Sequence, residues 1–246
     1  MRKLKEEKPW FVEWFDEDYR MLYRHRNSED ANEQVQLIID TLNPRKDMTI
    51  LDLGCGEGRY TAIFKKKGYK VYGLDLSETL VTYGKKRDPQ LDLVVGDMRA
   101  IPGHFDLILS LFTSFGYFDK DEENEQALNS VYRSLNPGGI YWLDFLNALY
   151  VEKNLVPESH SRLSSGIEVT EKRKITDGRI IKDIYFRSNG VNKYYRESVR
   201  LFSRECLEKM FRKTGFRVQE CFGDYHGNPC TSDTERTILV GRKEHE

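Results

Sequence analysis

The sequence predicts an α/β protein in which a mainly parallel sheet carries helices on both faces and a smaller antiparallel meander is inserted. Three observations predict this fold. Apolar strands and amphipathic helices alternate from residue 48 to residue 145, as parallel strands joined by helical crossovers require. The first strand runs into a glycine-rich turn, ILDLGCGEGRY at 50–60. Farther along, Asp177-Gly178 and Asn189-Gly190 are dipeptides preferred in tight hairpin turns.

The first 43 residues are predicted to form a helical cap. Aromatic residues recur at helical spacing from Trp10 to Tyr23, which is typical of an amphipathic helix. Its aromatic face could pack on the domain or cover a ligand, and both interpretations stay open. A second helix over 28–42 is expected to end at Asn43-Pro44.

The α/β core is assigned to residues 44–147 and 203–246. Ser77 is expected to cap one helix and Gly68 to close another, while Asn136 to Gly139 predicts a turn. The expected strands are 48–53, 69–75, 91–95, 105–111, 140–145, 216–222 and 234–240, and the expected helices are 59–67, 77–87, 121–135 and 203–213.

Residues 148–202 are predicted to form an inserted antiparallel β lid above the strand ends. Period-two patterning between residues 166 and 202 indicates three strands joined by the two hairpin turns. Arginines in these strands could meet an anionic acceptor or, paired with glutamates, form a salt-bridged sheet face. The arginines concerned are Arg173, Arg187, Arg196 and Arg200.

The glycine-rich turn is the first indication of a nucleoside site. Glycines allow positive φ and leave no Cβ to block a ligand, and the helix that follows turns its free N–H groups toward the turn. Acids stand at three strand ends: Asp52 just before the glycines, Asp75 after the second strand and Asp97 after the third. A carboxylate at the tip of the second strand can accept from both hydroxyls of a ribose.

Five segments together resemble the motifs of class I S-adenosylmethionine-dependent methyltransferases of the small-molecule type, over residues 45–146. They are DLGCGEG, GLDLSETL, VVGDM, FDLILSLF and LNPGGIYWLDF. The resemblance implies a Rossmann-like sheet of seven strands whose last pair is antiparallel. It also implies S-adenosylmethionine as cofactor, no metal, and in-line methyl transfer to an N or O nucleophile of a small-molecule acceptor.

The same resemblance assigns the cofactor contacts. Gly54, Gly56 and the backbone around Cys55 would face the methionine part, and Asp52 would hold its amino group. Asp75 would bind the ribose hydroxyls. The contacts implied around the adenine and over the ligand are Leu76, Asp97, Met98, Leu111 and Phe112.

The segment DYRMLYRHR and the loop FTSFGY at 112–117 resemble amino-sugar N-methyltransferases. The likeness places Tyr19 and Tyr23 against the cofactor and offers Tyr117 as a group that orients or deprotonates the acceptor. His226, in a loop between the last two strands, is the second catalytic candidate because an imidazole can act as a general base near neutral pH. The alternatives are a packed tyrosine with a satisfied hydroxyl and an exposed loop histidine.

Composition argues against several other classes. The chain has 39 basic and 40 acidic residues, so nothing global favours nucleic acid or an anionic membrane. Its four cysteines lack metal-ligand spacing, and no apolar run reaches transmembrane length, so a cytosolic setting is expected. Arg59 occupies the position at which the dinucleotide-binding fingerprint has its third glycine, which argues against a nicotinamide-dependent dehydrogenase. A protein or RNA substrate, a non-catalytic binding role, and a monomer or homodimer all stay open.

Overall fold

The computed structural model describes residues 9–23 and 28–244, and parts of the predicted cap, residues 1–8 and 24–27, lie outside them. Within the described residues, seven strands form one sheet in the order β10-β11-β5-β4-β1-β2-β3. Strand β1 lies parallel between β2 and β4, whereas β11 is antiparallel to both β5 and β10. This arrangement confirms the predicted fold. The strands are β1 Thr49–Leu53, β2 Lys70–Asp75, β3 Leu93–Val95, β4 Phe105–Ser110, β5 Leu135–Leu146, β10 Phe216–Phe222 and β11 Arg236–Lys243.

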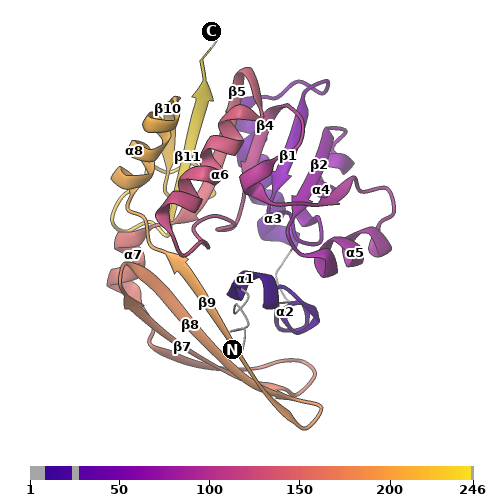
Figure 1. Ribbon diagram of the computed structural model, residues 1–246, viewed down its shortest axis with the longest axis vertical. Coiled ribbons are helices and arrows are strands. Elements are labelled where there is room, and N and C mark those ends of the chain that lie inside the picture. Colours follow the sequence, from indigo (N-terminus) through magenta and orange to yellow (C-terminus); the bar gives the residue numbers. More distant parts are fainter. Residues whose placement is uncertain (1–8, 24–27, 245–246) are drawn as a thin grey trace, which may run out of the picture.

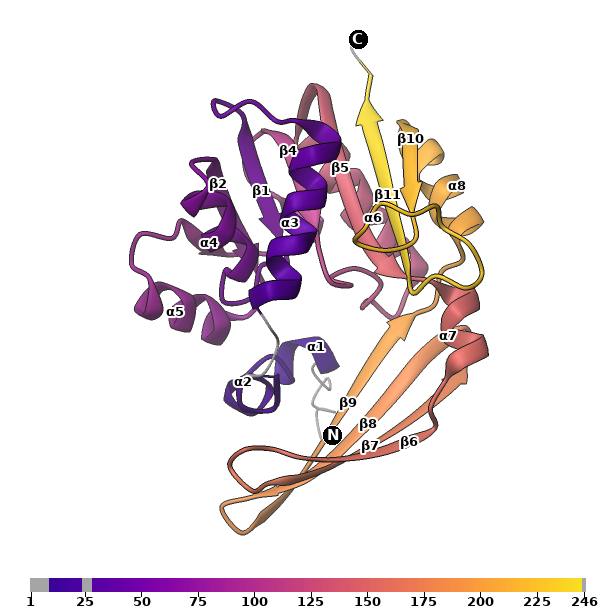
Figure 2. The same cartoon turned by 180° about the vertical axis from the view of Figure 1, so that it is seen from behind.

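Helices cover both faces of this sheet (Figures 1 and 2). Successive residues of β1 show why: Ile50 packs under α3 and α4, while Leu51 packs on the opposite side with α6 and α8. Helix α5 packs beside the edge strand β3. The helices are α3 Ser28–Leu42, α4 Arg59–Lys66, α5 Glu78–Arg87, α6 Asp121–Arg133 and α8 Arg204–Thr214. No helix of the described residues is long and apolar enough to cross a membrane.

Strand β5 begins earlier than predicted. The helix expected to reach Leu135 ends at Arg133, and Leu135 already pairs with Phe105 of β4. The predicted turn at residues 136–139 is an irregularity inside the strand, because the register shifts before Leu107 pairs with Ile140. Pairing with β4 therefore extends β5 through residues whose local preference is for a turn.

The inserted segment forms a second, four-stranded antiparallel sheet among the described residues, in the order β6-β7-β8-β9. Both predicted hairpin turns are present, since Asp177, Gly178, Asn189 and Gly190 all have positive φ, as type I′ turns require. Helix α7 and strand β6 were not predicted; the sequence of β6, ESHSR, lacks apolar alternation and becomes a strand by pairing with β7. The elements are α7 Ala148–Asn154, β6 Glu158–Arg162, β7 Glu168–Thr176, β8 Arg179–Ser188 and β9 Val191–Arg200.

The N-terminal segment lies between the core and the lid, as both views of the ribbon show (Figures 1 and 2). It forms two short helices, α1 Trp10–Glu13 and α2 Glu17–Tyr23, rather than one. Trp14 and Leu22 pack against Ile184 and other apolar residues of the lid. The described part of the predicted cap therefore divides, because residues 9–23 pack against the lid whereas α3 packs with β1 and α4 of the core.

Candidate active site

A cavity of about 1530 Å³ lies between the carboxyl ends of the core strands, the cap and the lid. All three parts line it: the glycine turn and the ends of β2 and β4 from the core, aromatic residues from the cap, and charged and polar residues from the lid. Ligands of open α/β sheets bind at this edge. The volume exceeds that of a usual small-molecule pocket, which leaves room for two ligands side by side.

The glycine turn exposes backbone to this cavity. Gly54 and Gly56 have φ of 76° and 57°, in the left-handed region that favours glycine. A Cβ on Gly54 would stand 2.5 Å from the Cβ of Ser114, whereas one on Gly56 would meet nothing nearer than 3.7 Å. Gly56 therefore faces open space that a ligand can enter. Cys55 contributes to the same wall, while its buried thiol, whose pKa burial raises, packs with apolar side chains behind the turn.

Asp75 lines the cavity and is tied to the glycine turn. Its two carboxylate oxygens accept from the backbone N–H of Gly56 at 2.7 Å and of Ser77 at 2.8 Å. Burial raises the pKa of Asp75, and these hydrogen bonds oppose that rise. Each oxygen keeps further acceptor capacity, so the predicted contact with a ribose diol stays a prediction that this geometry allows.

Asp97 also lines the cavity, but its carboxylate is held by a neighbour. The Arg99 guanidinium donates to both oxygens, to Oδ1 at 3.1 Å from Nε and to Oδ2 at 2.5 Å from Nη2, and the Arg99 backbone N–H donates to Oδ1 at 2.8 Å. Burial raises the pKa of Asp97, but the bonds from Arg99 outweigh it and the net shift is downward. A contact with an adenine amine would share this carboxylate with Arg99. Met98 and Leu76 line the cavity beside the two acids.

The prediction for Asp52 needs correction. Its side chain is 1% exposed and does not line the cavity. The carboxylate accepts from the N–H and the hydroxyl of Thr61, at 3.1 and 2.7 Å, and so fastens β1 to α4 beneath the turn. The amino group of a cofactor is therefore not assigned to Asp52.

Asp52 should make stability depend on pH. Burial raises the pKa of its carboxyl to about 6, above its unfolded value near 4. Between these values the folded state holds the extra proton, so stability falls as pH rises from 4 to 6. We expect the unfolding free energy of the wild type, relative to Asp52→Asn, to drop by about 1 kcal/mol per pH unit in this window and level off above it. Urea unfolding of both proteins from pH 4 to 8 measures this; a constant difference would contradict the assignment.

The segment after β4 forms another wall. Leu111 and Phe112 line the cavity, and Phe112 and Thr113 have φ of 53° and 64°, which is unusual for residues with a Cβ. Both backbone N–H groups are held by Asp144 of β5: Phe112 donates to its carboxylate at 2.8 Å and Thr113 to its carbonyl at 3.1 Å. Strained backbone of this kind persists only where its surroundings fix it.

Asp144 is the centre of a buried polar network below this wall. It is fully buried and pairs with Arg236, which is 9% exposed, at 2.6 Å. Arg236 also donates to the hydroxyl of Thr113 at 2.9 Å, and Tyr225 donates to Asp144 at 2.9 Å. Arg236 and Thr113 both line the cavity, so the network fixes the position of its wall.

The cap contributes aromatic residues to the cavity. Tyr19 and Tyr23 line it, and the Tyr23 hydroxyl accepts from Lys182 at 2.6 Å and donates to Glu197 at 3.1 Å. Tyr19 packs against Phe15, with ring centroids 4.8 Å apart. The tyrosines thus serve packing and also face the cavity, and their contact with a cofactor stays a prediction.

Trp10 of the cap holds a buried indole N–H that has no hydrogen-bond partner in the described chain. Trp10 also lines the cavity. A buried donor left alone costs about 1 to 3 kcal/mol, so a ligand that accepts from it would remove this cost.

The two catalytic candidates differ in placement. Tyr117 lines the cavity and packs against Trp10, with ring centroids 5.0 Å apart. His226 is exposed and does not line the cavity, so the proposal that it acts as a base is corrected. The reason is local: the His226 N–H is held by Asp224 at 2.9 Å, while the neighbouring Tyr225 turns inward to the buried network.

The lid arginines bind partners within the protein. Arg173 pairs with Glu171, Arg196 with Asp183, Arg200 with Asp121, and Arg187 donates to the carbonyl of Gly190. Among these four, Arg173 alone lines the cavity. Sequence reasoning missed the other polar residues of this wall, since no motif marks them. They are Arg162, Ser164, Ser165, Lys182, Ser188, Asn189 and Glu197. No group of His, Cys, Asp and Glu side chains in the described residues could hold a metal ion.

Residues 50–139 match the family model described as "Methyltransferase domain". The chain is 34% identical over 126 residues to dTDP-3-amino-3,4,6-trideoxy-alpha-D-glucopyranose N,N-dimethyltransferase of Streptomyces venezuelae, which covers 50% of this chain and 53% of that protein. The chain thus spans about half the length of this relative.

Two solved structures share the fold over nearly the whole chain. An S-adenosylmethionine-dependent methyltransferase from Clostridium acetobutylicum has a TM-score of 0.77 at 19% identity, covering 92% of this chain and 96% of that one. CalS10 from Micromonospora echinaspora, an amino pentose methyltransferase solved with bound S-adenosylmethionine, has a TM-score of 0.69 at 20% identity, covering 92% and 97%. At these identities the likeness establishes the fold alone.

Proposed function

We propose that this chain, whose residues 50–139 match a methyltransferase domain, is a class I S-adenosylmethionine-dependent methyltransferase that methylates the amine nitrogen of a small, sugar-like acceptor. The observation that carries the proposal is the single cavity shared by the glycine turn and the lid. Its core side has the strand-end acids of a nucleoside site, and its lid side has the polar lining that a hydroxylated acceptor needs.

The core side of the cavity fits S-adenosylmethionine. Gly56 leaves open space at the turn, and Asp75 is fixed there with acceptor capacity to spare. Gly54, the Cys55 backbone and Asp75 would hold the methionine and ribose parts. The remaining residues proposed to hold the cofactor are Tyr19, Tyr23, Gly56, Leu76, Asp97, Met98, Leu111 and Phe112.

When bound, S-adenosylmethionine supplies a methyl group on a positively charged sulfur, which leaves as a neutral thioether. The protein's own task is therefore to align the acceptor and to exclude water, and general acid catalysis of the leaving group is not required. Trp10, Phe15 and Tyr117 form an aromatic wall that excludes water, and we assign the orientation of the acceptor to the Tyr117 hydroxyl. A base is needed only if the amine arrives protonated.

The lid side supports an acceptor rich in oxygen atoms. Lys182 and Glu197 lie 2.5 Å apart on the cavity wall, near Arg173, and together they offer both donors and acceptors. The name of the Streptomyces venezuelae relative describes dimethylation of the amine of a nucleotide-linked amino sugar. An amino sugar is thus the acceptor class that we propose.

Calorimetric titration with S-adenosylmethionine, S-adenosylhomocysteine and NAD tests the first half of the proposal. We expect micromolar binding of the two adenosyl ligands and no response to NAD. Formation of S-adenosylhomocysteine is then followed with a dTDP-amino sugar, with the matching sugar that has a hydroxyl in place of the amine, and with simple amines. Turnover of the amino sugar alone is expected; equal turnover of the hydroxyl analogue would overturn the choice of nitrogen.

A further inference from the structure

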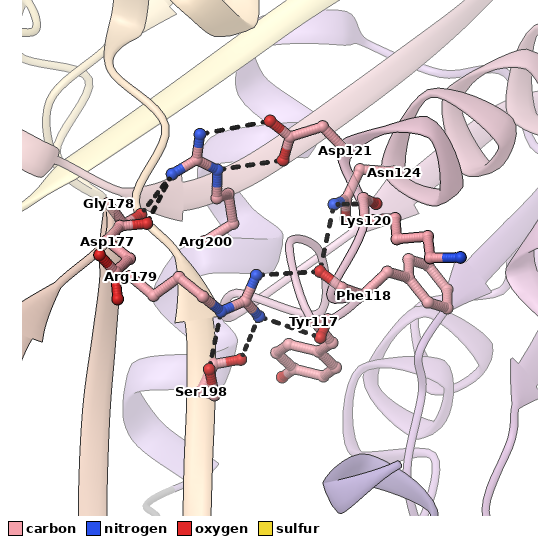
Figure 3. A network of polar contacts seen from close by, with 10 residues as sticks. All are labelled: Tyr117, Phe118, Lys120, Asp121, Asn124, Asp177, Gly178, Arg179, Ser198 and Arg200. Carbon is pink, nitrogen blue, oxygen red and sulfur yellow. Dashed lines mark hydrogen bonds and ion pairs between the residues drawn. The ribbon is translucent and has the colours of Figure 1, made fainter.

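Two arginines join the base of the lid to the core, and Figure 3 shows them with their partners. Arg179 begins β8 and Arg200 ends β9, and the two are directly opposite each other in the ladder. Like charges in opposite positions of a sheet destabilise it, so this pair calls for a separate explanation. We call the two arginines and the groups they bind the latch.

The Arg179 guanidinium spans two segments that are far apart in sequence. Within the lid it donates to the hydroxyl and carbonyl of Ser198, at 2.7 and 2.8 Å. Toward the core it donates to the carbonyls of Tyr117 and Phe118, at 3.2 and 3.0 Å. Only an arginine offers enough donors in a rigid fork to bind four such acceptors at once.

Arg200 forms the second half of the latch. It donates to both carboxylate oxygens of Asp121, at 3.0 and 3.2 Å, and to the carbonyls of Asp177 and Gly178. Its backbone N–H donates to the carbonyl of Gly116 at 2.8 Å, and that of Leu201 donates to Gly178 at 2.8 Å. Through these bonds the latch connects the start of β8 and the end of β9 to residues 116–121, the segment that follows β4.

The partners of Arg179 in the core are also cavity residues. Tyr117 and Phe118 line the cavity, as do Ile180 and Val199, the neighbours of the latch in β8 and β9. Among the described residues, neither Arg179 nor Arg200 forms a hydrogen bond or ion pair with the glycine turn or with Asp75. The latch reaches the cofactor side only through the ring of Phe118, which lies 4.6 Å from the Arg99 guanidinium, so we expect the acceptor side to depend on it far more than the cofactor side.

We propose that Arg179 is a positioning residue, which holds Tyr117 and the lid strands as one wall of the acceptor half of the cavity. This inference rests on the proposed function, because it is the proposed function that assigns that half of the cavity to an acceptor. Removing the Arg179 guanidinium should loosen the base of the lid and leave cofactor binding intact. Both effects can be measured without turnover.

The variants are Arg179→Met, which removes the guanidinium, and Arg179→Lys, which keeps one cation. Arg196→Met is the matched control, because Arg196 of β9 lies opposite Asp183 of β8 and pairs with it inside the lid. Hydrogen exchange of the Arg200 and Leu201 amides reports the lid base directly. Calorimetry with S-adenosylhomocysteine reports the cofactor half.

We expect Arg179→Met to speed exchange of these amides at least tenfold, Arg179→Lys to speed it less, and Arg196→Met to leave it unchanged. The affinity for S-adenosylhomocysteine should stay within threefold of wild type. Unchanged exchange in Arg179→Met, or a tenfold loss of S-adenosylhomocysteine affinity in Arg179→Lys, would overturn the proposal.

With a dTDP-amino sugar as probe, KM should rise about tenfold in Arg179→Met and recover partly in Arg179→Lys, and kcat should change less. A KM equal to wild type in Arg179→Met would also overturn it. A wild type that does not turn over this probe would refute the amino-sugar acceptor and leave the exchange result to decide the role of the latch.

Discussion

Replacing Arg236 by methionine is expected to lower the free energy of unfolding by about 3 to 5 kcal/mol, because it leaves the buried Asp144 carboxylate without its charge partner. Asp144 is fully buried and lies 2.6 Å from Arg236. The remaining donors to Asp144, the Phe112 N–H and the Tyr225 hydroxyl, are neutral. Urea unfolding followed by circular dichroism measures the loss.

A control and a double variant sharpen this test. Arg242 lies on the same strand and donates to the carbonyl of Gly138 at 2.8 Å, so Arg242→Met should cost only about 1 kcal/mol, the usual value of one hydrogen bond. Combining Arg236→Met with Asp144→Leu should recover only part of the lost stability, because an apolar pair replaces the buried charge but leaves the Phe112 N–H and the Tyr225 hydroxyl without their acceptor. A loss below about 1 kcal/mol in Arg236→Met would show that water reaches Asp144.

Replacing Asp75 by alanine is expected to weaken binding of S-adenosylmethionine by about 1 to 3 kcal/mol, or roughly 5- to 150-fold. The proposed ribose hydroxyls would lose their acceptor, and the N–H groups of Gly56 and Ser77 would lose the carboxylate that fixes the turn. Titration calorimetry at constant pH measures the change.

The matched control for this variant is Asp106→Ala. Asp106 is also next to a strand end and accepts from the backbone N–H of Thr49 at 2.8 Å, but it does not line the cavity. It should lower stability without changing cofactor affinity. If Asp75→Ala binds S-adenosylmethionine within twofold of wild type, the ribose contact is assigned to the wrong acid.

Much of the fold could be predicted because its signals are local. The positive φ of Gly54 and of the Asp177-Gly178 turn follow from residues that tolerate this conformation, and the nearly continuous apolar run of β1 follows from burial on both faces. Strand β6 and the start of β5 could not be predicted, because pairing with a neighbouring strand forms them against a weak local preference.

The candidate site divides in the same way. The glycine turn and Asp75 stand in one short stretch each, so their order along the chain indicates where they meet. The Asp144–Arg236 pair joins residues 92 positions apart, and the contact of Trp14 with Glu197 joins residues 183 positions apart. Asp52 was misassigned because sequence shows that it lies at a strand end but not toward which side its carboxylate turns.

By itself, the sequence determined the α/β class, the glycine turn, the strand-end acids and the hairpin turns, since each depends on the conformational preferences of a few adjacent residues. Tertiary structure alone decided that Tyr225 rather than His226 turns inward, that Arg179 joins the lid to the Tyr117 segment, and that Arg236 supports the cavity wall. These side chains are placed by partners distant in sequence. A buried charge or donor takes the position in which it finds a partner, and the fold of the whole chain decides where that partner lies.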